Sequence, residues 1–221
     1  MSMLIVLILL SSGCESSDGT ELTTTYFKAA GPGEAPKFTF GIIYPLVHPY
    51  YEIVTEGAEQ AAKGAGGRII IKAPDEANLE QQIRMIEDMI RQQVDGIAIS
   101  PIDSQELTPY INKAIEAGIP VICFESDAPA SGRLSFIGGD NERAGAMIAE
   151  ALQAIMGNEG MVLVGNGMPS MRSHVQRLNG LIDYIRESTN IQVLEVASHD
   201  GSDEMALSEI ERMIDAHPHF D

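Results

Sequence analysis

From Lys37 to the end of this 221-residue chain, short apolar runs alternate with segments of helical periodicity. The first four runs read FTFGIIY, RIIIKA, GIAIS and PVICF. Runs such as RIII and GIAI are continuous rather than alternating, as is typical of parallel strands that are buried on both faces. The segments between the runs predict helices over about 50–64, 78–93 and 104–117.

The helix predicted over 78–93 shows the pattern most clearly. Its apolar residues are spaced by four, three and four positions, at Leu79, Ile83, Ile86 and Ile90. This spacing places one apolar stripe on the helix, with polar side chains opposite, so the helix should cover one face of a sheet. Because crossovers between parallel strands are right-handed, the segment 37–138 predicts an α/β lobe with a doubly wound parallel sheet.

The same alternation starts again after LSFIGGDN. It predicts helices over about 142–156, 171–187 and 202–216, separated by the strands MVLVG and IQVLEVA. A sheet of two strands is marginal by itself. We therefore expect 139–221 to form an incomplete second α/β lobe, and the chain to be a truncated form or a fragment of a longer protein.

The first 36 residues follow a different pattern. An apolar stretch from Met3 to Leu10 is shorter than the roughly 20 residues that span a bilayer, and it leads through small residues to Cys14. This predicts a signal peptide over 1–14; the alternative is a short buried strand or helix. The polar segment 15–36, with Gly and Pro at its end, predicts a flexible tether.

Charge and cysteine content narrow the classes of partner. The formal net charge is -18, and such a field repels phosphate backbones, which argues against a nucleic acid partner. The end of the apolar stretch resembles the lipobox of bacterial lipoproteins, which implies lipidation of Cys14 and membrane contact only through a lipid anchor. The other cysteine, Cys123, lies in an apolar run, and we expect a buried thiol rather than a disulfide.

Candidate ligand-binding residues follow the strands, because ligands of open parallel sheets bind outside the carboxyl ends of the strands. The segments there contain tyrosines, carboxylates and an arginine, a mixture suited to a neutral polyhydroxy ligand. Asp103 and Ser104 are expected to cap the next helix instead. The segments read YPLVHPYY, PID, ESDAP, GNGMPSMR and SHDGSD.

From Lys37 to Asp221 the chain resembles the ribose-type periplasmic binding proteins, which share their fold with the effector domains of LacI-type repressors. The resemblance implies a periplasmic-binding-protein-like fold of two hinged lobes that close over a small molecule. It also implies a monomeric, extracytoplasmic protein without a cofactor, which captures a sugar for an ABC permease. The matching segments are, in order, GIIYPLVHPYYEIVTEGAEQAAK, VDGIAISPIDSQEL, IPVICFESDAP, IGGDNERAG, RLNG and AHP.

The resemblance assigns sugar-binding roles after the first strand. His48 would exchange a hydrogen bond with a ligand hydroxyl, and Tyr50 and Tyr51 would stack on the sugar ring. The alternative for the two tyrosines is that they pack the start of the first helix.

Further roles fall after the fourth strand and on the second lobe. Glu125 or Asp127 would accept hydrogen bonds from sugar hydroxyls, unless they are solvated loop carboxylates. Arg177 would reach the ligand from the second lobe, unless it forms an ion pair on a helix surface. Ser126 and Gly201 replace an arginine and an aromatic residue of the ribose binders, which argues against ribose itself.

Enzyme and repressor functions find little support. The segment GNGMPS has Ser170 where a dinucleotide fingerprint has its third glycine. His217 and His219 lack further ligands at metal-site spacing, no serine lies in a nucleophile elbow, and no basic DNA-binding headpiece precedes the fold. The remaining alternative to transport is a receptor that presents its ligand to a sensor kinase or a chemotaxis system.

Overall fold

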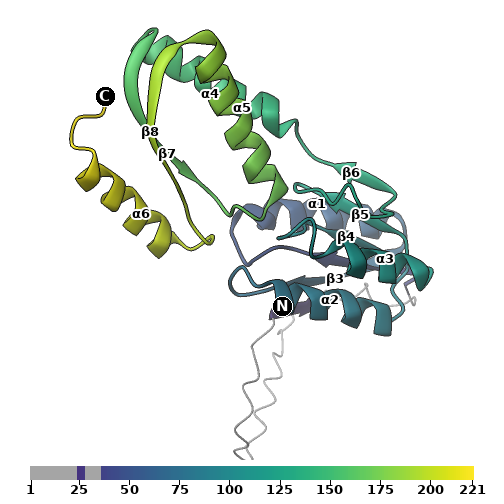
Figure 1. Cartoon of the computed structure of the whole chain (residues 1–221). Helices are drawn as coiled ribbons and strands as arrows, with labels where there is room; N and C mark the ends of the chain where they lie inside the picture. Colours follow the sequence, from purple (N-terminus) through teal and green to yellow (C-terminus); the bar gives the residue numbers. More distant parts are fainter. Residues whose placement is uncertain (1–23, 28–35) are drawn as a thin grey trace, which may run out of the picture.

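The computed structural model describes residues 24–27 and 36–221. The predicted signal peptide, Cys14 and most of the predicted tether lie outside this part. The described residues form two lobes, one built on a six-stranded sheet and one on a two-stranded sheet (Figure 1). The segment 138–140 connects them, between the last strand of the larger sheet and the first helix of the smaller lobe.

The larger sheet has the strand order β1-β3-β2-β4-β5-β6. All neighbouring strands are parallel except β1, which pairs antiparallel with β3 at the edge. The predicted parallel sheet is confirmed, but β1 lies within the predicted tether, where no strand was expected. The strands are β1 (Thr24–Phe27), β2 (Phe38–Ile43), β3 (Gly67–Ala73), β4 (Gly96–Ile99), β5 (Val121–Phe124) and β6 (Ser135–Ile137).

Helices cover both faces of this sheet, as a doubly wound topology requires. On β3, Ile69 and Ile71 pack with α1 on one face, whereas Ile70 belongs to the core cluster under α2 and α3 on the other. Successive side chains of a strand point to opposite faces, so a continuous isoleucine run serves both cores. The helices are α1 (Tyr50–Gly64), α2 (Leu79–Arg91) and α3 (Thr108–Glu116).

Local capping sets the start of α2 and of the turn before α3. The side chain of Asn78 accepts a hydrogen bond from the Gln81 amide and caps α2. The carboxylate of Asp103 accepts from the amides of Gln105 and Glu106 and so caps a turn. This turn precedes α3, which therefore begins four residues later than the sequence predicted.

The second lobe contains a parallel pair of strands, β7 and β8, packed with three helices. Its core lies between the strand pair and the helices α4 and α5, and includes Ala149, Val162, Leu181 and Ile185. The elements are α4 (Asn141–Met156), β7 (Glu159–Asn166), α5 (Arg172–Ser188), β8 (Asn190–Ser198) and α6 (Asp203–Ala216).

Two glycines bring the backbones of α4 and α5 into direct contact. A Cβ atom at Gly180 would lie 2.7 Å from the carbonyl carbon of Glu142, and one at Gly145 would lie 2.8 Å from the amide nitrogen of Leu181. Both distances are shorter than real Cβ contacts. The motifs NERAG and RLNG thus contain the two glycines that allow α4 and α5 to cross in close contact.

Candidate functional site

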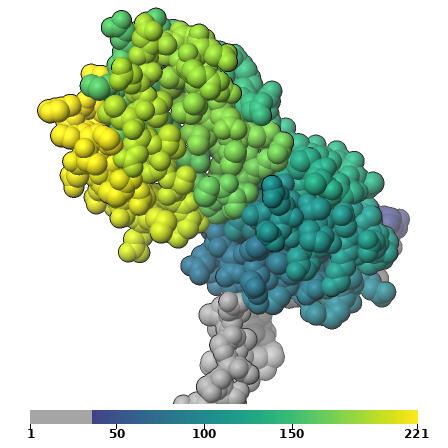
Figure 2. Space-filling view, in the orientation of Figure 1, coloured from purple at the N-terminus to yellow at the C-terminus, as the bar shows by residue number. Residues whose placement is uncertain are grey.

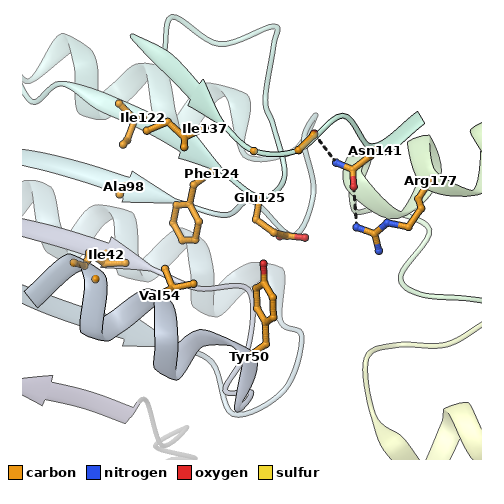
Figure 3. Close-up of a pocket in the computed structure, with 14 residues that line it drawn as sticks. Ile42, Tyr50, Val54, Ala98, Ile122, Phe124, Glu125, Ile137, Asn141 and Arg177 are labelled. Carbon is orange, nitrogen blue, oxygen red and sulfur yellow. Dashed lines mark hydrogen bonds between the residues drawn. The ribbon is translucent and has the colours of Figure 1, made fainter. Parts of the chain in front are cut away.

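A cavity of about 690 Å³ opens between α1, the sheet and the second lobe (Figure 3). Its floor is apolar and includes Val54, Ala98, Phe124 and Ile137. Val54 belongs to α1, whereas Ala98, Phe124 and Ile137 belong to β4, β5 and β6, so this lining is the sheet face beside α1. Polar side chains lie at one end of the cavity, and they are Tyr50, Glu125, Asn141 and Arg177.

Glu125 follows β5 and occupies a strained backbone conformation. Its φ of 58° lies in the left-handed region, which costs a residue with a Cβ roughly 1–3 kcal/mol. The carboxylate accepts hydrogen bonds from the Ser100 hydroxyl (2.6 Å, to Oε2) and from the Ser173 hydroxyl (3.1 Å, to Oε1). The strain aims an acceptor into the cavity at the carboxyl end of the sheet.

Tyr50 and Tyr51 occupy different environments. Tyr50 is 57% exposed and lines the cavity. Tyr51 is buried, with its ring stacked on Tyr44 at 4.5 Å between centroids. Burial raises the pKa of Tyr51, as does the nearby Glu125 carboxylate, while a hydrogen bond with Ser100 opposes the shift. Its placement favours a packing role for Tyr51 over ring stacking on a ligand.

His48 and Asp127 do not line the cavity. His48 accepts a hydrogen bond from the Tyr50 amide at its Nδ1 (3.1 Å) and so helps to begin α1. Asp127 forms a bidentate ion pair with Arg133, in which the Nη2–Oδ2 distance is 2.6 Å. Because this pair neutralises the carboxylate within its own loop, the structure favours Glu125 over Asp127 as the acidic ligand-binding residue.

Arg177 lies on the second-lobe side of the cavity (Figure 3). Its Nη2 donates to the Asn141 Oδ1 at 2.8 Å. The partner is a neutral amide on α4, not the carboxylate that a helix-surface ion pair would require. The glycine contact between α4 and α5 lies one helical turn further along, so it positions both side chains.

Sequence reasoning missed a buried glutamine that connects the loops around the site. The Gln82 amide is fully buried; it donates to the carbonyls of Tyr44 (3.1 Å) and Ser100 (2.8 Å) and accepts from the Ile102 amide (3.0 Å). It thereby ties the residues that follow β2 and β4 to α2. A signal was present, since Gln82 lies three residues after Leu79 on the apolar stripe of the helix.

Ser100, Ser173 and Asn141 were also missed. Small polar residues of this kind are common in loops and at helix starts, so only their tertiary contacts distinguish them. Near them, burial lowers the pKa of His174, against an opposing effect of the Glu125 carboxylate. The buried Nδ1 of His174 has no hydrogen-bond partner among the described residues.

Two further searches covered the described part of the chain. Within residues 24–27 and 36–221, no cluster of three or more His, Cys, Asp or Glu side chains could hold a metal ion. The helices described here are too short or too polar to cross a membrane.

Comparison with known proteins gives consistent relatives. The ribose import binding protein RbsB of Bacillus subtilis (strain 168) is 26% identical over 192 residues, which are 86% of this chain and 62% of that protein. A solute-binding protein of an ABC transporter from Burkholderia graminis C4D1M, solved in complex with D-arabinose, superposes with a TM-score of 0.81 at 29% identity. That match covers 86% of this chain and 65% of the other.

A third similar structure is the XylFII–LytSN complex. Its match has a TM-score of 0.76 at 27% identity and covers 80% of this chain and 65% of that one. The present chain spans about 60% of the length of the curated relatives that it resembles most extensively.

The family described as periplasmic binding protein domain matches residues 41–221. This range includes most of the first lobe, all of the described second lobe and every polar residue at the end of the cavity. The match agrees with the expectation of a binding protein rather than an enzyme. The chain therefore belongs to the periplasmic binding protein family.

Proposed function

We propose that this chain is the ligand-capturing part of an extracytoplasmic sugar-binding protein. The observation that carries the proposal is the polar end of the cavity, where Tyr50 and Glu125 of the first lobe face Asn141 and Arg177 of the second. A ligand held there contacts both lobes at once, as capture by closure requires.

The chemistry of these groups suits a small neutral sugar. The Glu125 carboxylate accepts hydrogen bonds from hydroxyls, and the Arg177 guanidinium donates them. The Tyr50 ring offers an apolar face to the CH groups of a pyranose or furanose. The arabinose-bound relative and the ribose-binding relative support this class of ligand.

Thermal unfolding in the presence of sugars tests the proposal. D-ribose, D-arabinose, D-xylose and D-glucose should be added at 10 mM, because a dissociation constant of about 1 mM would then stabilise the fold by about 1.4 kcal/mol. Glu125→Gln should lower the affinity for the stabilising sugar about tenfold, since the hydrogen bonds to a charged acceptor are weakened. Glu116→Gln, an exposed carboxylate on α3, is the matched control and should bind as the parent does.

Two results would contradict the sugar proposal. One is a shift with an amino acid or a nucleoside and with none of the sugars. The other is an equal affinity of the Glu125→Gln variant and the parent for the sugar that shifts the parent.

We further propose that the protein acts at the cell envelope, as a lipoprotein monomer that delivers its sugar to an ABC permease. The lipobox-like end of the apolar stretch supports lipidation of Cys14, and the solute-binding relative from Burkholderia graminis supports the transporter. Metabolic labelling with palmitate in the source cell should mark the protein and should not mark its Cys14→Ser variant. Labelling of that variant would refute lipidation at this residue.

A receptor role is the second candidate function. The observation that favours it is the similarity of this chain to a structure in which XylFII forms a complex with a second protein, LytSN. Deletion of the gene distinguishes the two roles. Loss of uptake of the radiolabelled sugar supports transport, whereas intact uptake with a lost transcriptional response to the sugar supports the receptor.

A further inference from the structure

Three side chains of one segment of the second lobe, Met168, Met171 and Ser173, are buried, whereas Pro169, Ser170 and Arg172 between them are exposed. Met168 and Met171 belong to the same core cluster as Ile102 and Leu107, and they are 5% and 1% exposed. In the space-filling view the two lobes are in contact (Figure 2). The loop after β7 therefore contributes apolar side chains to the core of the other lobe.

Ser173 adds hydrogen bonds across the same boundary. Its side chain is buried, its hydroxyl donates to the Glu125 Oε1 at 3.1 Å, and its amide donates to the Ser126 hydroxyl at 3.5 Å. The other oxygen of the Glu125 carboxylate accepts from Ser100, which follows β4. Each carboxylate oxygen is thus held by a serine, one from each lobe.

This arrangement couples the carboxylate to the relative position of the lobes. Separation of the lobes would remove the Ser173 hydroxyl from Glu125 but would leave Ser100 in place, because Ser100 and Glu125 follow the adjacent strands β4 and β5 of the first lobe. The Ser173 hydrogen bond therefore stabilises the closed arrangement and not the separated one. The net contribution of a hydrogen bond to a charged acceptor, after the cost of removing both groups from water, corresponds to about a tenfold change in the equilibrium between separated and closed lobes.

We propose that Ser173 is a positioning residue that holds the Glu125 carboxylate across the lobe boundary and favours closure before a sugar binds. The effect on sugar affinity rests on the proposed function, whereas the effect on closure does not. In the described arrangement of the lobes Tyr50, Glu125 and Arg177 face one cavity, so a contact that holds the lobes in this arrangement also prepares the site.

The distance between the lobes tests closure without any ligand. Nitroxide labels at Gln60→Cys on α1 and Asn179→Cys on α5, both exposed positions, report this distance by pulsed electron paramagnetic resonance in a Cys14→Ser background. Ser173→Ala should increase the population of long distances about tenfold. Ser131→Ala is the matched control, because it removes a serine hydroxyl that bonds to Ala128 within one loop of the first lobe, and it should leave the distances unchanged.

Glu125→Ala completes a double-mutant cycle. It should open the lobes about as much as Ser173→Ala does, and the double variant should open them no further, since both changes remove the same hydrogen bond. A distance distribution of Ser173→Ala that matches the parent, or additive effects of the two changes, would overturn the proposal.

Sugar kinetics give a second readout with D-arabinose or D-ribose as the probe. Ser173→Ala should raise the dissociation rate about tenfold and leave the association rate nearly unchanged, because the hydrogen bond forms only after the lobes close. An unchanged dissociation rate would contradict the proposal. If no sugar binds the parent, the proposed function fails and the distance measurement still decides whether Ser173 favours closure.

Discussion

Replacing Gly180 with alanine tests whether the backbone contact between α4 and α5 holds the second lobe together. The new Cβ would lie 2.7 Å from the carbonyl carbon of Glu142, and closer still to its oxygen, whereas ordinary contacts begin at 3.4 Å. The obstructing atoms belong to a helix backbone and cannot rotate away. The helices must therefore separate by about 1 Å at their crossing.

The expected cost follows from overpacking. Inserted methyl groups cost about 1–3 kcal/mol in a packed interior, and this site lies at the upper end because both sides are backbone. The better helix propensity of alanine returns at most about 1 kcal/mol. The net loss of about 2 kcal/mol should lower the unfolding temperature of a lobe of this size by roughly 8–16 °C.

Differential scanning calorimetry measures the unfolding temperature, and Gly57→Ala provides the matched control. Gly57 lies within α1, and a Cβ there would meet nothing within 4 Å. The same substitution should stabilise that helix by about 0.4–1 kcal/mol. Unfolding of Gly180→Ala at or above the temperature of the parent would refute the reasoning.

Three further predictions concern buried polar groups. Gln82→Leu should lower the free energy of unfolding, measured by urea denaturation, by about 3 kcal/mol, because it leaves two carbonyls and an amide without their hydrogen bonds. Gln81→Leu should cost far less, because the buried Oε1 of Gln81 has no partner among the described residues, and equal costs of the two changes would contradict this. Burial lowers the pKa of His174, so below pH 6.5 the unfolded chain binds a proton that the folded chain does not, and the free energy of unfolding decreases as the pH is lowered. The His174→Gln variant should therefore lose less thermal stability than the parent between pH 7 and pH 5, and an equal loss in both proteins would exclude the effect. Burial raises the pKa of Cys123 to about 11, so iodoacetamide should alkylate this thiol at pH 8 only in urea, as peptide mass spectrometry would show; rapid alkylation of the native protein would disprove it.

The strands and helices could be predicted because their signals are local. The continuous isoleucine run of β3 and the apolar stripe of α2 each require a buried environment on a defined side, and the fold satisfies both. The start of α3 was missed because Asp103 caps a turn as readily as a helix, and both use the same hydrogen bonds to backbone amides. Strand β1 reads TTYF and consists of residues that favour strands, but it is a short run within a polar segment, and its pairing with β3 is a tertiary contact that the local sequence does not specify.

The candidate site also contains residues that the sequence predicted and residues whose role depends on tertiary contacts. Tyr50, Glu125 and Arg177 were predicted by their positions after strands or by family motifs, and the structure places all three around one cavity. His48 and Asp127 have the right chemistry in the same segments, but their neighbours satisfy them as a helix-starting acceptor and an ion-pair partner. The order of strands in the sequence predicts that these side chains lie at the edge of the sheet, but it does not predict which of them already has a hydrogen-bond or ion-pair partner.

The amino-acid sequence by itself determined the alternating α/β architecture, the family and the edge of the sheet where ligands are expected. These properties depend on periodicity and on motifs that act over one or two helical turns. The tertiary structure alone decided which polar groups remain for a ligand, how Gln82 joins the loops and that Ser173 reaches Glu125 from the other lobe. Such contacts join residues that are 18 and 48 positions apart, and no local pattern specifies a hydrogen bond at that separation.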